Sequence, residues 1–165
     1  MSTVTRLVSK SNWDLNLEME NPGVDGQTVQ PSEFNPAQVV YTPTSTPPAS
    51  MYLAEEITGD SGTASVTIDL ADFDDVEGIA KNATGLKVQE VRIQAAADNA
   101  AVVNVAPGDT NPYALFGSAN DVDVPPAGLL HARFNDELAD VASGAKNIKL
   151  TVGHGDVVSV EIILG

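Results

Sequence analysis

From residue 51 onward the chain alternates between apolar and polar positions with a period of two, the spacing of half-buried β-strands. Between residues 63 and 70, for instance, Val66, Ile68 and Leu70 fall on one face and polar residues fall on the other. Turn residues separate most segments of this kind. Eight strands are predicted, at residues 51–57, 63–70, 86–95, 101–105, 112–116, 127–134, 148–152 and 158–164. Strands of this number and length are typical of an all-β fold, a single β-sandwich or jelly roll.

Irregularities in the pattern carry further predictions. The apolar phase slips at Gln89 and Glu90, which indicates a β-bulge. The run GHGD at residues 153–156 predicts a hairpin turn between the last two strands, because glycine readily adopts positive φ. Residues 69–80 and 135–144 are each predicted to contain a single helical turn inserted between strands.

The first 50 residues differ in composition and are predicted to form an extended, Pro-rich N-terminal arm. Six of the ten prolines lie there, and residues 41–50 are typical of a semi-extended linker. Residues 13–19 alternate apolar with polar side chains, which predicts one isolated strand. Such a strand cannot bury its tryptophan alone, so it packs either on its own domain or on a neighbouring chain. The chain therefore divides into an arm, residues 1–50, and a β-sandwich (jelly-roll) domain, residues 51–165.

Charge and composition exclude several classes of function. The chain has 8 Lys and Arg against 23 Asp and Glu, a net charge of −15. Direct binding to nucleic acid or to an anionic membrane is disfavoured, because both need a basic surface. The absence of cysteine removes disulfides, thiol nucleophiles and zinc–thiolate sites. No signal peptide and no apolar run of about 18 residues is visible, so we expect a soluble protein made in the cytoplasm.

An acidic stretch at residues 69–78 is the first candidate for a site. Closely spaced carboxylates can hold calcium. The helix–loop–helix calcium pattern fails, however, because Val76 occupies the third ligand position and no Glu closes the loop. A solvated acidic loop is the preferred interpretation, and cation binding is left open.

The two histidines give little support to catalysis. His131 faces outward beside Arg133, where a cupin-type metal site would need a second histidine. His154 lies between two glycines in a turn that lacks the GxGxxG spacing of a phosphate-binding loop. No serine lies in a G-x-S-x-G elbow. We therefore predict no enzyme activity, no cofactor and no catalytic or metal site, and we assign His131 to a surface or an interface.

A cysteine-free, acidic β-sandwich with a long N-terminal arm resembles the small jelly-roll decoration (cement) proteins on the heads of tailed bacteriophages. The resemblance is carried by ITGDSGTASVTIDL, VAPGDTNPYALFG and GAKNIKLTVGHGDVVSVEIILG at residues 57–70, 105–117 and 144–165. It implies a structural virion protein on the outer capsid surface that stabilises contacts between capsomers. The implied partners are the major capsid protein and neighbouring copies of the chain, commonly as homotrimers.

The arm supplies the predicted partner-binding residues, which are Arg6, Lys10, Trp13, Leu15 and Leu17. The two cations give the first ten residues a charge of +2, whereas the remainder carries 6 − 23 = −17. A cationic tip on an acidic body suits docking on an acidic protein surface. On the last strand, Val157 and Ile163 are predicted to face outward, which favours the burial of this face in a homotrimer.

Two other classes of function stay open at this point. A carbohydrate- or receptor-binding module of a fibre or adhesin would show two or three surface aromatic residues in a line. A small cupin-like enzyme would hold a bound metal.

Overall fold

The computed structural model describes residues 7–9, 39–41, 48–60, 62, 64–74, 78–118 and 120–165. All regular secondary structure in these residues is β; they contain no helix, and so none that is long and apolar enough to cross a membrane. The predicted all-β class is confirmed. The strands are β1 (Leu7–Ser9), β2 (Val39–Tyr41), β3 (Met51–Thr58), β4 (Ala64–Asp69), β5 (Phe73–Asp74), β6 (Ala80–Lys81), β7 (Val88–Ala95), β8 (Val103–Pro107), β9 (Val122–Val124), β10 (Leu129–Arg133), β11 (Asn147–Val152) and β12 (Val157–Leu164).

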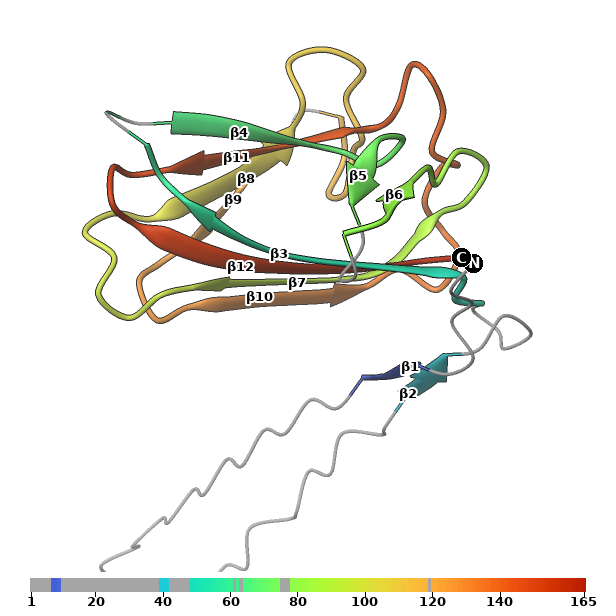
Figure 1. Ribbon diagram of the computed structural model, residues 1–165, viewed down its shortest axis with the longest axis horizontal. Coiled ribbons are helices and arrows are strands. Elements are labelled where there is room, and N and C mark those ends of the chain that lie inside the picture. Colours follow the sequence, from blue (N-terminus) through green and yellow to red (C-terminus); the bar gives the residue numbers. More distant parts are fainter. Residues whose placement is uncertain are drawn as a thin grey trace, which may run out of the picture.

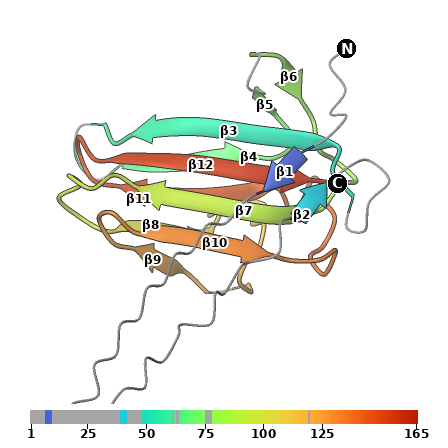
Figure 2. The same ribbon diagram turned by 90° about the horizontal axis from the view of Figure 1, so that it is seen from below.

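Two four-stranded antiparallel sheets lie face to face and form the body of the protein (Figure 1). One has the order β10-β7-β12-β3 and is called the β3 sheet; Figure 2 shows it from outside. The other has the order β4-β11-β8-β9 and is called the β4 sheet. Along the chain, the strands pair from the outside inward: β3 with β12, β4 with β11, β7 with β10, and β8 with β9. This nested pairing is that of a jelly roll.

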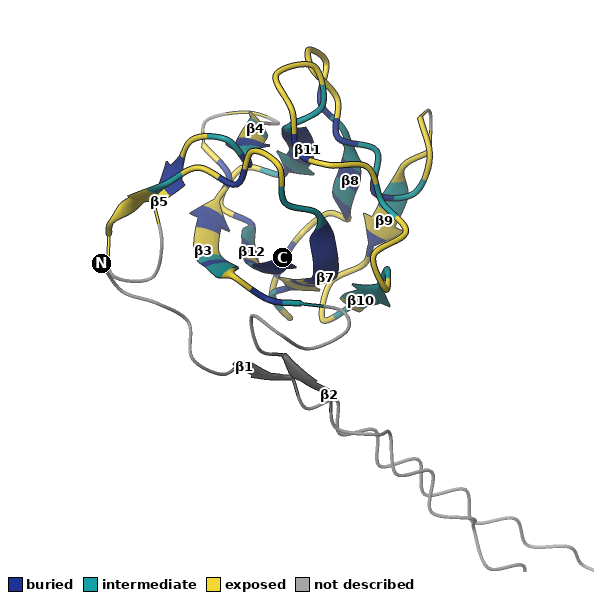
Figure 3. Ribbon diagram, turned by 90° about the vertical axis from the view of Figure 1, so that its right-hand side faces the viewer, coloured by how far each residue is buried: buried dark blue, intermediate teal, exposed yellow. Residues whose placement is uncertain are grey.

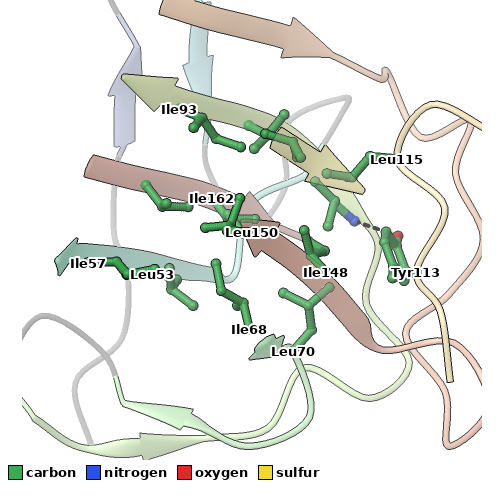
Figure 4. Packing of buried hydrophobic residues seen from close by; sticks show 14 of the residues in the cluster. Leu53, Ile57, Ile68, Leu70, Ile93, Tyr113, Leu115, Ile148, Leu150 and Ile162 are labelled. Atoms are coloured by element: carbon green, nitrogen blue, oxygen red, sulfur yellow. Dashed lines mark hydrogen bonds between the residues drawn. The ribbon is translucent and has the colours of Figure 1, made fainter. Parts of the chain in front are cut away.

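The period-two pattern of the sequence fills the space between the two sheets. Leu150 of β11 and Ile162 of β12 are fully buried there, together with Leu53 of β3 (Figure 4). Figure 3 shows buried residues in strands of both sheets. Burying a side chain of this size contributes about 1.5–3 kcal/mol. The buried members of this described core all lie within residues 53–164.

The predicted bulge is confirmed, and it determines which face of the sheet carries the Glu90 side chain. β12 pairs Ile163 with Glu90 but Leu164 with Val88, so Gln89 is the extra residue. The Gln89 side chain donates to the Gly165 carbonyl oxygen at 3.2 Å and accepts from the Asp136 backbone N–H at 2.9 Å. The bulge returns Val88 to the core while Glu90 keeps the outer-face phase of β7.

The predicted hairpin at residues 153–156 is wrong. β11 belongs to the β4 sheet and β12 to the β3 sheet, so this turn carries the chain from one sheet to the other. The turn crosses the loop after β3 so closely that a Cβ on Gly59 would lie 1.8 Å from the Gly153 carbonyl oxygen. Glycine is therefore required for a close approach at residue 59.

Residues 112–116 form no strand, contrary to prediction. Pro112 makes one isolated bridge with Asn147, and Tyr113 then docks into the core (Figure 4). Its hydroxyl donates to the Ala139 carbonyl oxygen at 2.7 Å and accepts from the Val88 backbone N–H at 3.1 Å. The alternation here comes from a loop that buries Tyr113 and Leu115. Such a loop imitates the apolar–polar pattern of a strand.

The two predicted helical turns are also wrong within the described residues. The first stretch holds a turn followed by the β5–β6 pair, with Phe73 opposite Lys81. Residues 135–144 contain turns and bends. β9 was not predicted, because three residues are too few to show a period.

Candidate interaction surface

The outer face of the β3 sheet arranges its side chains in three rows across the four strands. The rows are Leu129, Gln94, Ser159 and Glu56 (the open row), His131, Arg92, Glu161 and Ala54 (the middle row), and Arg133, Glu90, Ile163 and Tyr52 (the covered row). Burial increases from the first row to the last: Leu129 is 38% exposed, whereas Glu90 and Ile163 are 4% and 6% exposed. One end of this face is thus closed and the other is open.

A buried carboxylate links β7 to β10 in the covered row. Glu90 Oε1 lies 2.8 Å from His131 Nε2, and Arg133 Nε donates to Glu90 Oε2 at 2.9 Å. A carboxylate this deeply buried is costly unless charged or polar partners surround it. Glu90 therefore fastens β10 to β7 in addition to the backbone hydrogen bonds.

The middle row is partly exposed and mixed in charge. Arg92 lies 3.5 Å from Glu161 and also donates to the Gln94 side chain at 3.2 Å. Burial raises the pKa of the nearby Tyr52 hydroxyl; the Glu161 charge raises it further and Arg92 opposes this. Tyr52 therefore remains a neutral hydrogen-bonding group at physiological pH.

The arm joins the body at residues 48–50, here called the arm root, beside the covered row. Ala49 is fully buried with Ile163, and Tyr52 packs against both. The Ser50 N–H donates to the Leu164 carbonyl oxygen at 2.7 Å. The arm thus leaves the body from one fixed place at the end of β12.

The arm root corrects a prediction about the last strand. Ile163 does lie on the outer face, but its own chain covers it, and Val157 is only partly exposed. The physical reason is that residues preceding β3 fold back over the end of the sheet. An open apolar face on β12 is therefore no argument for a homotrimer.

The five predicted arm residues, Arg6, Lys10, Trp13, Leu15 and Leu17, lie outside the described residues. The predicted strand at residues 13–19 also lies outside them. Within the arm, β1 and β2 pair antiparallel, with Leu7 opposite Tyr41 and Ser9 opposite Val39. Residues 10–38 therefore connect two strands that are paired with each other.

The other predicted site residues have local structural partners. In the acidic stretch, Asp69 accepts from the Ala71 backbone N–H at 2.9 Å and forms an ion pair with Lys146. His154 is exposed in its turn, with Nδ1 3.1 Å from the Asp60 carbonyl oxygen. Among the described residues, no group of His, Cys, Asp and Glu is arranged to hold a metal ion.

Glu90 is the buried residue of this face that the sequence pattern did not predict as an ion-pair partner. It was identified only as part of a bulge. A usable signal was present, because His131 and Arg133 alternate on one predicted strand and an acidic residue across from them is favourable. The pairing of β10 with β7, which the sequence pattern does not reveal, is what brings these residues together.

Comparison with known proteins adds little to this geometry. No protein-family model and no curated protein matches the chain. Among solved structures, it is similar to tomato aspermy virus, determined by X-ray crystallography, with a TM-score of 0.41 and 11% sequence identity over 69% of this chain and 76% of that chain. At this score and identity the likeness bears on neither family nor function, and the jelly-roll assignment rests on the strand order.

Proposed function

We propose that the chain is a structural virion protein that binds the outside of a bacteriophage capsid and stabilises contacts between capsomers. The observation that carries the proposal is the position of the core. Its buried members among the described residues lie within residues 53–164, so the described strands downstream of the arm root form a jelly roll with a core of its own. We assign the contacts with other molecules to the preceding 47 residues, which contain the only tryptophan.

The charge distribution supports an external position. Residues 48–165 contain 6 Lys and Arg against 18 Asp and Glu, a net charge of −12. Such a body is repelled by packaged nucleic acid, whereas the cationic tip with Arg6 and Lys10 is attracted to acidic protein surfaces. A capsid lattice repeats each contact many times, so weak individual contacts become strong together.

The described aromatic residues favour this role over a sugar-binding module. A sugar-binding face needs exposed rings, but the five aromatic side chains of residues 48–165 are all buried or partly buried: Tyr52, Phe73, Tyr113, Phe116 and Phe134. Phe116 and Phe134 lie against each other with ring centroids 6.0 Å apart.

Deletion of residues 1–47 tests the proposal. The deletion keeps the arm root, because Ala49 and Ser50 contact the body. The shortened chain should keep a β-type circular dichroism spectrum, while its binding to undecorated capsids should fall by about 10²–10⁴-fold. Loss of Trp13 and Leu15 burial alone would remove about 2–3 kcal/mol each.

A charge variant with Arg6→Ala and Lys10→Ala serves as the matched control. It should weaken binding mainly at low salt, because salt screens exposed charges. If the shortened chain binds capsids as well as the full chain does, the arm is only a tether and the proposal for the arm fails. If the shortened chain unfolds, the arm belongs to the body's own fold.

A further inference from the structure

β4 forms one edge of the β4 sheet, and among the described residues no strand pairs with its outer side. Figure 3 shows β4 at the end of this sheet, followed by β11, β8 and β9. The Leu70 N–H donates to the Lys146 carbonyl oxygen, and the Gly108 N–H donates to the Asn147 carbonyl oxygen. The even-numbered residues of β11 therefore bond to β4, and the odd-numbered residues bond to β8.

The same alternation fixes the direction of the backbone groups of β4. Its even-numbered residues lie opposite the even-numbered residues of β11, so these are the residues that bond inward. The backbone N–H and C=O groups of Ser65 and Thr67 consequently point away from β11, and both residues are exposed. An edge with such outward groups is a template for a further strand.

This edge is also neutral over most of its length. Residues 64–68 are Ala, Ser, Val, Thr and Ile, and the strand ends at Asp69, which forms an ion pair with Lys146. The inner side of the edge is apolar, because Val66 packs against the core while remaining partly exposed.

The other three edges of the two main sheets carry charged side chains. On β3, Glu55 lies in the inward phase opposite the buried Val160, and yet it is exposed. A charge that points inward on an edge strand opposes the addition of another strand. The charged residues of these edges are Glu55 and Glu56 on β3, His131 and Arg133 on β10, and Asp123 on β9.

We infer that β4 pairs antiparallel with β4 of a second copy of the chain, across a two-fold axis. Residues 48–165 carry a net charge of −12, so two copies repel each other wherever their acidic surfaces meet. The neutral β4 edge is the place where two such bodies approach with the least repulsion. This dimer forms with or without a capsid, so it goes beyond the proposed function and does not rest on it.

One register satisfies the backbone and both faces of the joined sheet. With Val66 opposite its counterpart, Ser65 of each copy lies opposite Thr67 of the other. These are the residues whose backbone groups point outward, so each such pair exchanges two hydrogen bonds. The hydroxyl side chains then meet on the outer face, and the two Val66 side chains cover each other on the inner face. A two-fold contact of this kind needs the self-complementary surface that β4 provides.

The dimer has a distinctive dependence on salt. A single pair of strands is a small interface, so we expect weak and reversible association. Salt should strengthen it, because salt screens the repulsion between two acidic bodies. The proposed docking of the cationic arm tip on an acidic capsid surface should instead weaken with salt.

Disulfide trapping tests the register in the full-length chain, which has no cysteine of its own. Opposite residues of a hydrogen-bonded pair lie about 5.5 Å apart at Cα, within the range of a disulfide. A mixture of Ser65→Cys and Thr67→Cys chains should give a disulfide-linked dimer on a non-reducing gel. Either variant alone should give little, because its cysteine lies opposite an unchanged residue. Both replaced side chains are exposed, so the fold should be retained.

The matched control is a mixture of Ala54→Cys and Glu56→Cys chains, which have the same spacing on the charged β3 edge. This mixture should give little product. Equal linkage at both edges, or no linkage at β4, overturns the β4 assignment. Linkage by either β4 variant alone that equals the linkage in their mixture overturns the register.

Sedimentation of the full chain over a range of concentrations provides the second test. Thr67→Glu should raise the dissociation constant of the dimer about tenfold or more, because it adds like charge at the contact. Ser159→Glu adds the same charge at an exposed position on β12, a central strand, and should change the constant much less. A chain that stays monomeric throughout, or equal effects of the two variants, overturns the dimer. Capsid binding, measured separately, decides the proposed function.

Discussion

The ion pairs of the β3 sheet show why burial decides which contacts stabilise the protein. Glu90 is 4% exposed and bonds to His131 and Arg133, whereas Arg92 and Glu161 form an exposed pair on the same face. Exposed pairs contribute little, because water already solvates both charges. Removal of one partner from a buried carboxylate leaves charge that water cannot reach.

We therefore predict that Arg133→Ala lowers the free energy of unfolding by about 3 kcal/mol. The matched variant Arg92→Ala should cost less than about 1 kcal/mol. Urea denaturation of both proteins measures the difference. Equal, small losses would show that Glu90 does not depend on its cationic partner.

Asp156 gives a second prediction for a single residue. Its buried carboxylate accepts from the Ala100 and Ala101 backbone N–H groups at 2.7 and 3.1 Å. Asp156→Ala should lower the free energy of unfolding by about 2 kcal/mol, because two backbone N–H groups lose a charged acceptor. His154→Ala in the same turn is the control and should be nearly neutral. A similar loss in both variants would contradict this account.

At the scale of elements, the sequence predicts the strands well but not their pairing. Alternation located β3, β4, β7, β8, β10, β11 and β12, because each buries one face. The same alternation says nothing about which sheet a strand joins, so residues 153–156 were predicted as a hairpin and cross between sheets instead. Residues 112–116 alternate because Tyr113 and Leu115 anchor a loop.

The loop that Tyr113 anchors should make the free energy of unfolding depend on pH in the alkaline range. Burial raises the pKa of the Tyr113 hydroxyl, against the hydrogen bond from Val88, and Asp140 raises it further. A raised folded-state pKa means that this stabilisation is complete below the ordinary tyrosine value, about 10, and is lost as the pH rises through the folded value.

Tyr113→Phe should therefore be less stable than the native chain at neutral pH by about 1–2 kcal/mol, because the Val88 N–H loses its acceptor. Its stability should also fall less steeply above about pH 10. Denaturation series at neutral and alkaline pH measure both effects. Parallel pH profiles for the two proteins would rule out Tyr113 as the group responsible.

At the scale of the whole molecule, the proposed function assigns contacts with the capsid to the N-terminal arm of the protein. Its single tryptophan, Trp13, provides a direct report of the arm's surroundings. Emission from Trp13 should shift to shorter wavelength on assembly and return on dilution, because burial removes water from the indole ring. An emission maximum that does not change on assembly would show that Trp13 lies outside the contact with the capsid.

The central claim is that this chain sits on the outside of a capsid as a structural component. The most direct measurement is a pair of cryo-electron microscopy reconstructions, of particles assembled with the chain and of the same particles without it. The account predicts difference density at the outer surface, at regular lattice positions, that fits the two-sheet jelly roll. No difference outside the shell, or density within it, would contradict the account.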